Sequence, residues 1–301
     1  MITDTQQRPM VVAALVAMRP RQWLKNILVF AAPLAAGSVF EVNVFWPTVG
    51  AFIAFCLVSS ATYLINDLRD IKTDQQHPTK RFRPIPAGEL PPVVAMAMAI
   101  VLVASSGVLA FAIRPELAGV IGIYFVFTLS YSLGLKHEPV IELALLSMGF
   151  LLRAVAGGVA SDLPISQWFL IVAGFGSLFM AAGKRYCEMS WLEAVAGDQP
   201  EIKRKSLEGY TLSYLRFVWG LAAAVTITAY CLWAFEVGTA PSTLPWAQWS
   251  VLPFVLAILR YAVGIDQGKA EAPEDAVLRD KVLLVLGFAW IVLFGLGALG
   301  V

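Results

Sequence analysis

Residues 91–113 read PPVVAMAMAIVLVASSGVLAFAI and contain no charged side chain. A transmembrane helix needs about 20 mainly apolar residues, so this stretch is long enough to cross a bilayer. Five further charge-free stretches resemble it, and three weaker ones are interrupted by a charge or a proline. We therefore expect an all-α polytopic membrane bundle of about nine transmembrane helices, over 23–40, 46–65, 91–113, 117–135, 139–160, 163–183, 217–235, 246–265 and 282–301.

The overall composition excludes most other classes of protein. The chain has 301 residues, of which 58% are hydrophobic and 14% charged, whereas soluble domains have about 45–50% apolar and about 25% charged residues. Three cysteines and two histidines, far apart along the chain, make neither a disulfide scaffold nor a zinc site of histidine and cysteine ligands. A net charge of +1 provides no general attraction to nucleic acid.

The distribution of basic residues predicts the orientation in the membrane. With the N-terminus inside the cell, all of the 22 lysine and arginine residues except Arg114 and Arg153 fall on or next to the cytoplasmic side, as the positive-inside rule requires. We expect one membrane domain over 1–301 in the cell membrane, with 1–21 cytoplasmic or interfacial. The polar loops at about 66–90 and 184–213 then both face the cytoplasm and cap the active site.

The first polar loop begins with an acidic motif. Residues 66–74 read NDLRDIKTD, so Asp67, Asp70 and Asp74 have the spacing i, i+3, i+7 and share one face of a continuous helix. Carboxylates in such a row repel one another unless a cation lies between them, and Mg²⁺ binds a few carboxylates together with the oxygens of a substrate phosphate. The alternative is an ordinary solvated helix end.

A basic turn follows the acidic motif. We expect His77 before Pro78 to end the helix, because the residue before a proline is pushed out of the α region. Lys80, Arg81 and Arg83 come directly afterwards. Acids that bind metal beside bases that bind phosphate make a site for a Mg²⁺-complexed diphosphate, although positive-inside topology or lipid contact would also explain these bases.

The second polar loop begins differently. It reads KRYCE over 184–188, with the cations Lys184 and Arg185 and the single acid Glu188. Two fixed cations suit a directly bound phosphate, and the alternative is a pair of bases at a helix end that reach the membrane surface. Arg153 lies within an expected helix, where a structural hydrogen-bonding role and a substrate role are equally open.

These residues resemble a known family. The motif at 66–74 is similar to the NDxxDxxxD signature of the UbiA superfamily, membrane transferases that act on polyprenyl substrates, and the helix count fits that family across the whole chain. The closer resemblance is to the subfamily of decaprenyl-phosphate phosphoribosyltransferases. It rests on RPRQWLKN at 19–26, HPTKRFRP at 77–84 and KRY at 184–186.

The resemblance implies a Mg²⁺-dependent transfer of 5-phosphoribose from 5-phosphoribosyl 1-diphosphate (PRPP) to decaprenyl phosphate for cell-wall arabinan synthesis. It makes Asp67, Asp70 and Asp74 catalytic, with Asn66 as a further metal ligand. It leaves a homo-oligomer open and implies no nucleic-acid partner. The substrate-binding residues that it implies are Lys25, Asn66, Lys80, Arg81, Arg83, Tyr131, Lys136, Lys184, Arg185 and Glu188.

Two other functions compete with this interpretation. An aromatic prenyltransferase of the same superfamily would use a prenyl diphosphate, but it carries a second aspartate-rich motif where this chain has KRYCE. A transporter or lipid-binding protein without chemistry would place its charged sites near the bilayer midplane. Here the charges gather in two loops instead.

Overall fold

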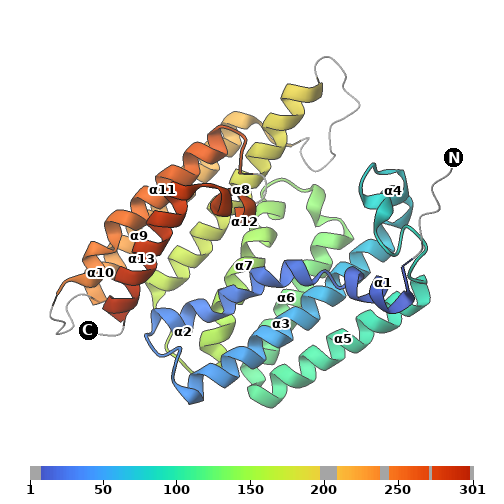
Figure 1. The fold of residues 1–301 in the computed structure, drawn as a ribbon, viewed down its shortest axis with the longest axis horizontal. Coiled ribbons are helices and arrows are strands. Elements are labelled where there is room, and N and C mark those ends of the chain that lie inside the picture. The colour runs from blue at the N-terminus through green and yellow to red at the C-terminus, as the bar shows by residue number, and fades with distance from the viewer. Residues whose placement is uncertain (1–7, 197–208, 238–243, 271–272, 299–301) are drawn as a thin grey trace.

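The computed structural model describes residues 8–196, 209–237, 244–270 and 273–298, and every regular element in these ranges is a helix (Figure 1). In chain order the elements are α1 (Met10–Ala17), η1 (Pro20–Phe30), α2 (Ala31–Ala35), α3 (Val42–Arg69), α4 (Ile71–Gln76), η2 (Lys80–Phe82), α5 (Pro92–Ile113), α6 (Pro115–Leu133), η3 (Leu135–His137), α7 (Ile141–Ala160), α8 (Gln167–Ala196), α9 (Leu212–Val237), α10 (Trp246–Trp249), α11 (Val251–Asp266), α12 (Pro273–Arg279) and α13 (Lys281–Ala298).

The expected all-α membrane bundle is confirmed. Within the described ranges, eight helices are long and apolar enough to cross a membrane, and each coincides with one of the nine expected helices. The expected helix at 246–265 is formed by α10 and α11 together. Long apolar runs without charge leave the backbone no alternative to helical hydrogen bonding inside a bilayer, which is why hydropathy located these elements.

The expected helix over 23–40 differs from the others. Pro20–Phe30 winds as a 3₁₀-helix, and a single short α-helix, Ala31–Ala35, follows it. A 3₁₀-helix rises about 2.0 Å per residue against 1.5 Å for an α-helix, so the two elements still extend roughly 30 Å. This thin segment packs tightly on α7, where a Cβ added at Gly157 would lie 1.8 Å from the carbonyl oxygen of Val29.

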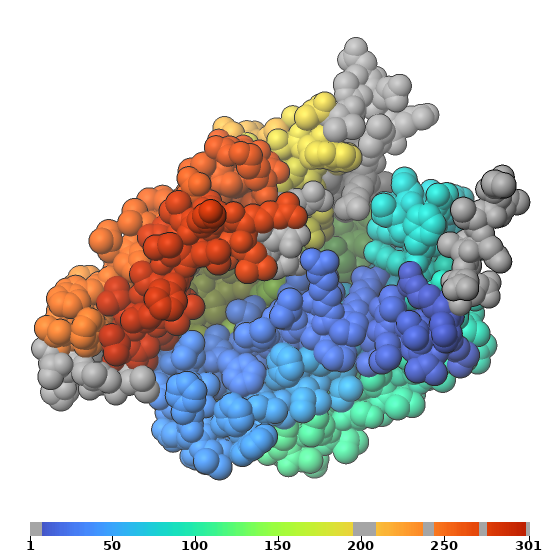
Figure 2. All heavy atoms as spheres, viewed as in Figure 1, coloured from blue at the N-terminus to red at the C-terminus, as the bar shows by residue number. Residues whose placement is uncertain are grey.

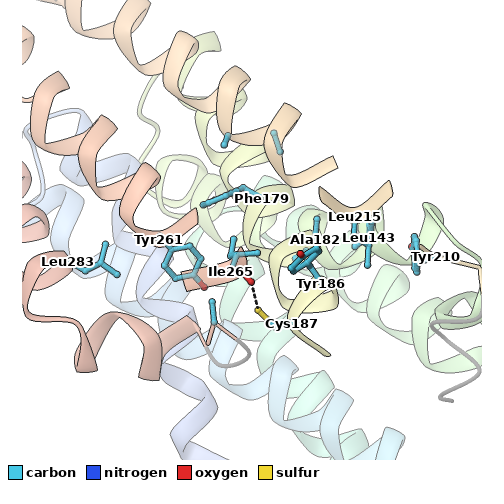
Figure 3. Packing of buried hydrophobic residues seen from close by; sticks show 14 residues of the cluster. Leu143, Phe179, Ala182, Tyr186, Cys187, Tyr210, Leu215, Tyr261, Ile265 and Leu283 are labelled. Atoms are coloured by element: carbon cyan, nitrogen blue, oxygen red, sulfur yellow. Dashed lines mark hydrogen bonds between the residues drawn. The ribbon is translucent and has the colours of Figure 1, made fainter. Parts of the chain in front are cut away.

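Two large buried clusters hold the bundle together. One lies between α3, α5, α6, α7 and η1 and includes Phe55, where the Phe55 ring packs edge-on against Tyr124 at 5.2 Å. The other lies between α7, α8, α9, α11 and α13 and includes Phe179, Tyr261 and Ile265 (Figure 3). The helix α7 contributes to both clusters, so it joins the two parts of the bundle.

One end of the bundle carries most of the buried and half-buried ion pairs, and we call it the charged end. Here α3, α6, α8 and α11 end and α5, α7, α9 and α13 begin (Figure 1). Lys136 after α6 contacts Asp70 after α3, with Nζ 3.4 Å from Oδ2. Arg216 at the start of α9 contacts Asp266 at the end of α11 at 2.8 Å. Both motifs singled out in the sequence lie at this end.

Candidate active site

The acidic motif does not form one continuous helix. α3 ends at Arg69, Asp70 has φ −94° and ψ 11°, and α4 begins at Ile71. The expected row of three carboxylates on one helix face is therefore broken at its middle member. Asp67 and Asp74 are buried and face the basic turn, whereas Asp70 faces Lys136. The expected end of the helix at His77 is confirmed, because α4 ends at Gln76 and His77 is extended.

Arg83 joins the two buried carboxylates. Its Nη1 donates a hydrogen bond to Oδ1 of Asp67 at 3.0 Å and another to Oδ2 of Asp74 at 2.7 Å. Nζ of Lys80 lies 3.7 Å from Oδ1 of Asp74. Two of the three predicted acids and two of the three predicted bases therefore form one group. Arg81 points elsewhere and stacks on the ring of Phe82.

Arg19 is a member of this group that the motif analysis did not assign. Its Nη2 lies 2.6 Å and 2.8 Å from the two carboxylate oxygens of Asp67, and its guanidinium covers the ring of Tyr63. Arg19 has φ 55°, an uncommon conformation for a residue with a Cβ. Strain of this kind persists where the surroundings fix the residue and is concentrated at functional sites. The signal in the sequence was its place in the stretch at 19–26.

A cavity of about 300 Å³ adjoins these side chains, and we call it the arginine cavity. Its lining includes Arg8, Arg19, Arg83 and the single acid Asp67, with Thr79 and Phe82 completing its polar and apolar walls. Arg8 was not assigned from the sequence either, and it lies 3.8 Å from Glu89. Three guanidinium groups around one cavity suit phosphate oxygens, which arginine binds in a bidentate manner.

The KRYCE motif forms a second buried group. Nε of Arg185 donates to Oε1 of Glu142 at 2.8 Å, and the same guanidinium also contacts Glu188 and the hydroxyl of Tyr131. In the described chain, Oε2 of Glu142 is buried without a hydrogen-bond partner. The guanidinium of Arg185 is thus surrounded by protein acids, while Lys184 is half-buried nearby on α8. The prediction that Lys184 and Arg185 bind a phosphate stays a prediction.

The start of α7, which carries Glu142, is supported by Tyr210. The hydroxyl of Tyr210 accepts a hydrogen bond from the backbone N–H of Val140 at 2.8 Å. Val140 has φ 68°, a rare conformation for a β-branched residue. Burial raises the pKa of Tyr210 to about 12, so the phenol is neutral at physiological pH.

The segment after α6 connects the two groups. Tyr131 contacts Arg185, Lys136 contacts Asp70, and Arg69 donates to the backbone oxygen of Leu133 at 2.9 Å. The predicted pair Tyr131 and Lys136 therefore lies between the acidic motif and the KRYCE motif. Lys25 and Asn66 are half-buried on η1 and α3 and do not line the arginine cavity.

The contacts of Arg153 are those that the structural interpretation expects, and its substrate role stays a prediction. Its guanidinium donates to Oδ1 of Asn26 at 2.7 Å, to the backbone oxygen of Gly149 and to the hydroxyl of Tyr124. These partners come from η1, α6 and α7 itself. Arg153 thus has a structural hydrogen-bonding role, joining the 3₁₀ segment to the bundle.

An apolar pocket of about 210 Å³ lies deeper between η1, α2 and α13. It is lined by η1, α2, α7, α8, α9, α11 and α13 through residues that include Leu28, Phe150, Tyr230, Phe254 and Trp290. Figure 2 shows the surface hollow between α13 and the η1–α2 segment, with green atoms of the α7–α8 part of the chain at its floor. The pocket suits a hydrocarbon chain.

The residues of the acidic motif fit a divalent cation of the Mg²⁺ kind. In the described part of the chain, no three histidine, cysteine or acidic side chains form a group that could hold a metal ion. Mg²⁺ needs fewer, because it is usually bound by one or two carboxylates, waters and substrate phosphates. Asp67 and Asp74 already converge on one positively charged nitrogen, Nη1 of Arg83. Both supply hard oxygen ligands, and Asp67 also lines the arginine cavity, which suits phosphate.

The UbiA prenyltransferase family matches residues 26–292 of this chain. The chain belongs to this family. The resemblance that the motif at 66–74 indicated is therefore confirmed.

Curated relatives within the UbiA family are similar over nearly the whole chain. The decaprenyl-phosphate phosphoribosyltransferase of Corynebacterium glutamicum is 51% identical over 280 residues, which cover 91% of this chain and 83% of the relative. The protein of the same name from Mycobacterium tuberculosis is 48% identical over 296 residues, which cover 97% of this chain and 96% of the relative. The subfamily indicated by the motifs at 19–26, 77–84 and 184–186 is thus the one that these relatives represent.

Solved structures of UbiA proteins share the fold. A UbiA homologue from Archaeoglobus fulgidus bound to DMAPP and Mg²⁺ superimposes with a TM-score of 0.70 at 16% identity, covering 96% of this chain and 99% of that chain. A digeranylgeranylglyceryl phosphate synthase superimposes with a TM-score of 0.61 at 16% identity, covering 98% and 100%. At such identities the likeness concerns the arrangement of helices alone.

Proposed function

We propose that this protein transfers the 5-phosphoribosyl group of PRPP to decaprenyl phosphate and releases diphosphate. The observation that carries the proposal is the sequence identity of 48–51% with curated decaprenyl-phosphate phosphoribosyltransferases over most of both chains. The arginine cavity supports it, because the donor carries phosphates at both ends. The apolar pocket supports it too, because the acceptor is a phosphate on a long hydrocarbon chain.

The acidic motif is the proposed place of the divalent ion. Asp67 and Asp74 would hold Mg²⁺, with Asn66 on α3 and Asp70 between α3 and α4 as the further ligands that the resemblance implies. When bound, the ion would act as a Lewis acid that stabilises negative charge on the leaving diphosphate. Arg83 and Lys80 then have a second role. Their side chains, which now contact Asp74, can bind diphosphate oxygens instead and stabilise the charge on the leaving group.

The proposed chemistry needs no nucleophile from the protein. An anionic oxygen of the acceptor phosphate attacks the anomeric carbon of the ribose and forms the new C–O bond. The bond between that carbon and the diphosphate oxygen breaks, and its electron pair leaves with the diphosphate. Because this is a direct displacement, we expect the anomeric configuration to invert. The chain's own residues align the two phosphates and exclude water, and alignment of this kind can lower a barrier by about 7–11 kcal/mol.

The proposed location is the cell membrane with the charged end in the cytoplasm. The multiple apolar helices make this a polytopic membrane protein. The described basic residues gather at the charged end, including Lys80, Lys136 and Lys184, while Arg114 lies between α5 and α6 at the other end. This distribution supports a cytoplasmic active site through the positive-inside rule. The expected basic residues at 203–205 lie outside the described residues.

The experiment that tests this function measures diphosphate release by purified protein in detergent or nanodiscs. We expect release only when PRPP, decaprenyl phosphate and Mg²⁺ are all present, and loss of release in Asp74→Asn. Geranyl diphosphate with an aromatic acceptor serves as the competing substrate pair. Turnover of that pair without consumption of PRPP would contradict the proposal and would show that the protein is an aromatic prenyltransferase.

A further inference from the structure

The short helix α1 has an unusual distribution of side chains for a helix on the outside of the bundle. Its eight residues, MVVAALVA, include no polar side chain. The small residues Ala13 and Ala17 face the bundle and are 0% and 1% exposed. The larger residues Val11 and Leu15 face outward and are 72% and 52% exposed. A helix that is apolar all round is buried in protein or in a membrane, so the outer face of α1 suits an apolar partner.

The inner face of α1 makes only a small contact with the bundle. Ala13 and Ala17 belong to a buried cluster that includes Leu64 near the end of α3 and Ala95 near the start of α5. An alanine buries less apolar surface than a valine or a leucine, and the stabilisation from burial follows that surface. The larger side chains of α1 are therefore left for a contact outside the bundle.

The depth of α1 in the bundle is that of a membrane surface. Leu64 precedes the end of α3 by five residues and Ala95 follows the start of α5 by three, so both contacts lie within about 8 Å of the charged end. Figure 1 shows α1 beside this end of the two helices. The start of α5 also exposes the apolar residues Val93 and Met96, so the outer face of α1 adjoins the surface of a membrane-crossing helix. An eight-residue helix extends about 12 Å and is too short to cross a bilayer itself.

The same helix forms one wall of the arginine cavity. Four of the nine residues that line the cavity come from α1 and its flanks: Arg8, Val16, Ala17 and Arg19. The basic turn with Arg83 forms much of the opposite wall. The position of α1 therefore determines how far the two arginines at its ends lie from the basic turn.

We propose that α1 is a membrane-surface helix, whose outer face lies in the lipid leaflet at the charged end and whose lipid contact holds Arg8 and Arg19 at the arginine cavity. The apolar surface that α1 shares with the start of α5 favours lipid as the occupant over a second copy of the chain. The exposed cations Arg8 and Arg21 flank the helix, and cations at such places interact with anionic lipid headgroups. The proposal rests on the proposed function only for the identity of the donor in the cavity.

The first test measures the depth of α1 in full-length protein in lipid nanodiscs, with no substrate present. Spin labels are attached to Leu15→Cys, to Ile100→Cys on the exposed side of α5 as the lipid reference, and to Lys72→Cys on α4 as the water reference. The unsubstituted protein provides the background of the native cysteines. We expect oxygen to relax the label at position 15 more than a water-soluble nickel chelate does, as at position 100. Stronger relaxation by the chelate would place the face in water, and protection from both would place it against protein; either result overturns the proposal.

The second test measures the affinity for PRPP by isothermal titration calorimetry in the same nanodiscs. Val11→Gln together with Leu15→Gln makes the outer face polar at positions that do not line the cavity. Glutamine forms helices about as well as leucine and better than valine, so α1 remains helical. Because a charge-assisted contact to phosphate is weakened when the arginines are no longer held, we expect binding to be about tenfold weaker or more.

Two matched variants control this measurement. Val93→Gln, at a position that is 80% exposed at the start of α5 and does not line the cavity, should bind PRPP as the wild type does. Val11→Ile together with Leu15→Met keeps the face apolar and should also retain the affinity. Unchanged affinity in the polar double variant, or an equal loss in either control, would overturn the link between lipid contact and cavity. Absence of PRPP binding by the wild type would instead contradict the proposed function, while the spin labels still decide whether α1 contacts lipid.

Discussion

Arg83 holds Asp74 through a hydrogen bond of 2.7 Å between Nη1 and Oδ2, and the same nitrogen reaches Asp67. A guanidinium therefore stands between two carboxylates that the proposed function assigns to a divalent ion. Together with Arg19, it neutralises the acidic motif when no diphosphate is bound. Metal and diphosphate should then bind as a complex, because the phosphates give the arginines a replacement partner.

The first prediction concerns Arg19. Arg19→Gln removes a charge-assisted contact with Asp67, which is worth about 1.5–3 kcal/mol in such pairs. We expect Mn²⁺ alone, measured by electron paramagnetic resonance, to bind more tightly by roughly 10- to 150-fold, and PRPP to bind more weakly. Arg21→Gln, two residues away and exposed, is the control. Unchanged Mn²⁺ affinity in Arg19→Gln would show that the arginine does not compete with the ion.

The second prediction concerns Asp67, whose side chain is 2% exposed and which contacts both arginines. Asp67→Asn should abolish turnover while the protein remains folded and inserted, because an amide neither binds Mg²⁺ strongly nor pairs with guanidinium groups. Turnover is measured over a range of Mg²⁺ concentrations, with size-exclusion behaviour as the folding control. A wild-type rate at both limiting and saturating Mg²⁺ would contradict the assignment.

The third prediction separates two roles of Arg185. Arg185→Ala leaves Glu142 as an uncompensated buried charge, and breaking such a pair costs about 3–5 kcal/mol. Thermal stability should therefore fall and should recover in part when Glu142→Gln is added. If Arg185 also holds a phosphate, the double variant should keep a raised KM for one substrate. A double variant with wild-type KM values for both substrates would make Arg185 purely structural.

The fourth prediction concerns topology. Cysteines introduced at Gln76 on α4 and at Asp162 after α7 lie at opposite ends of the bundle, and both positions can be reached by reagents. In intact cells, a membrane-impermeant thiol reagent should label Asp162→Cys and not Gln76→Cys. The native cysteines are buried or half-buried, and the unsubstituted protein provides the background. Labelling of Gln76→Cys from outside would reverse the orientation.

Hydropathy alone predicted most of the fold, because a membrane-crossing segment is a local property of the chain. The segment Pro20–Phe30 was the exception. It packs through Val29 against Gly157, which lies far along the sequence. Such a contact leaves no local pattern.

The site was predictable to the extent that its residues are neighbours in sequence. Asp67, Asp74, Lys80 and Arg83 come together as their motif indicated. The partnership of Arg19 with Asp67 joins positions 48 residues apart, and that of Arg185 with Glu142 joins positions 43 residues apart. No spacing rule covers these separations. The interruption of the helix at Asp70 could not be predicted from local sequence either. Asp70 contacts Lys136, which lies 66 residues further along the chain.

The central claim is that this chain joins a phosphoribosyl group to a lipid phosphate. The most direct measurement is the mass spectrum of the lipid extracted after purified protein has reacted with PRPP, decaprenyl phosphate and Mg²⁺. The account predicts a new lipid whose mass equals decaprenyl phosphate plus one phosphoribosyl group, with equimolar diphosphate released, and its absence with Asp67→Asn. Decaprenyl phosphate recovered unchanged with folded wild-type protein and intact substrates would contradict the account.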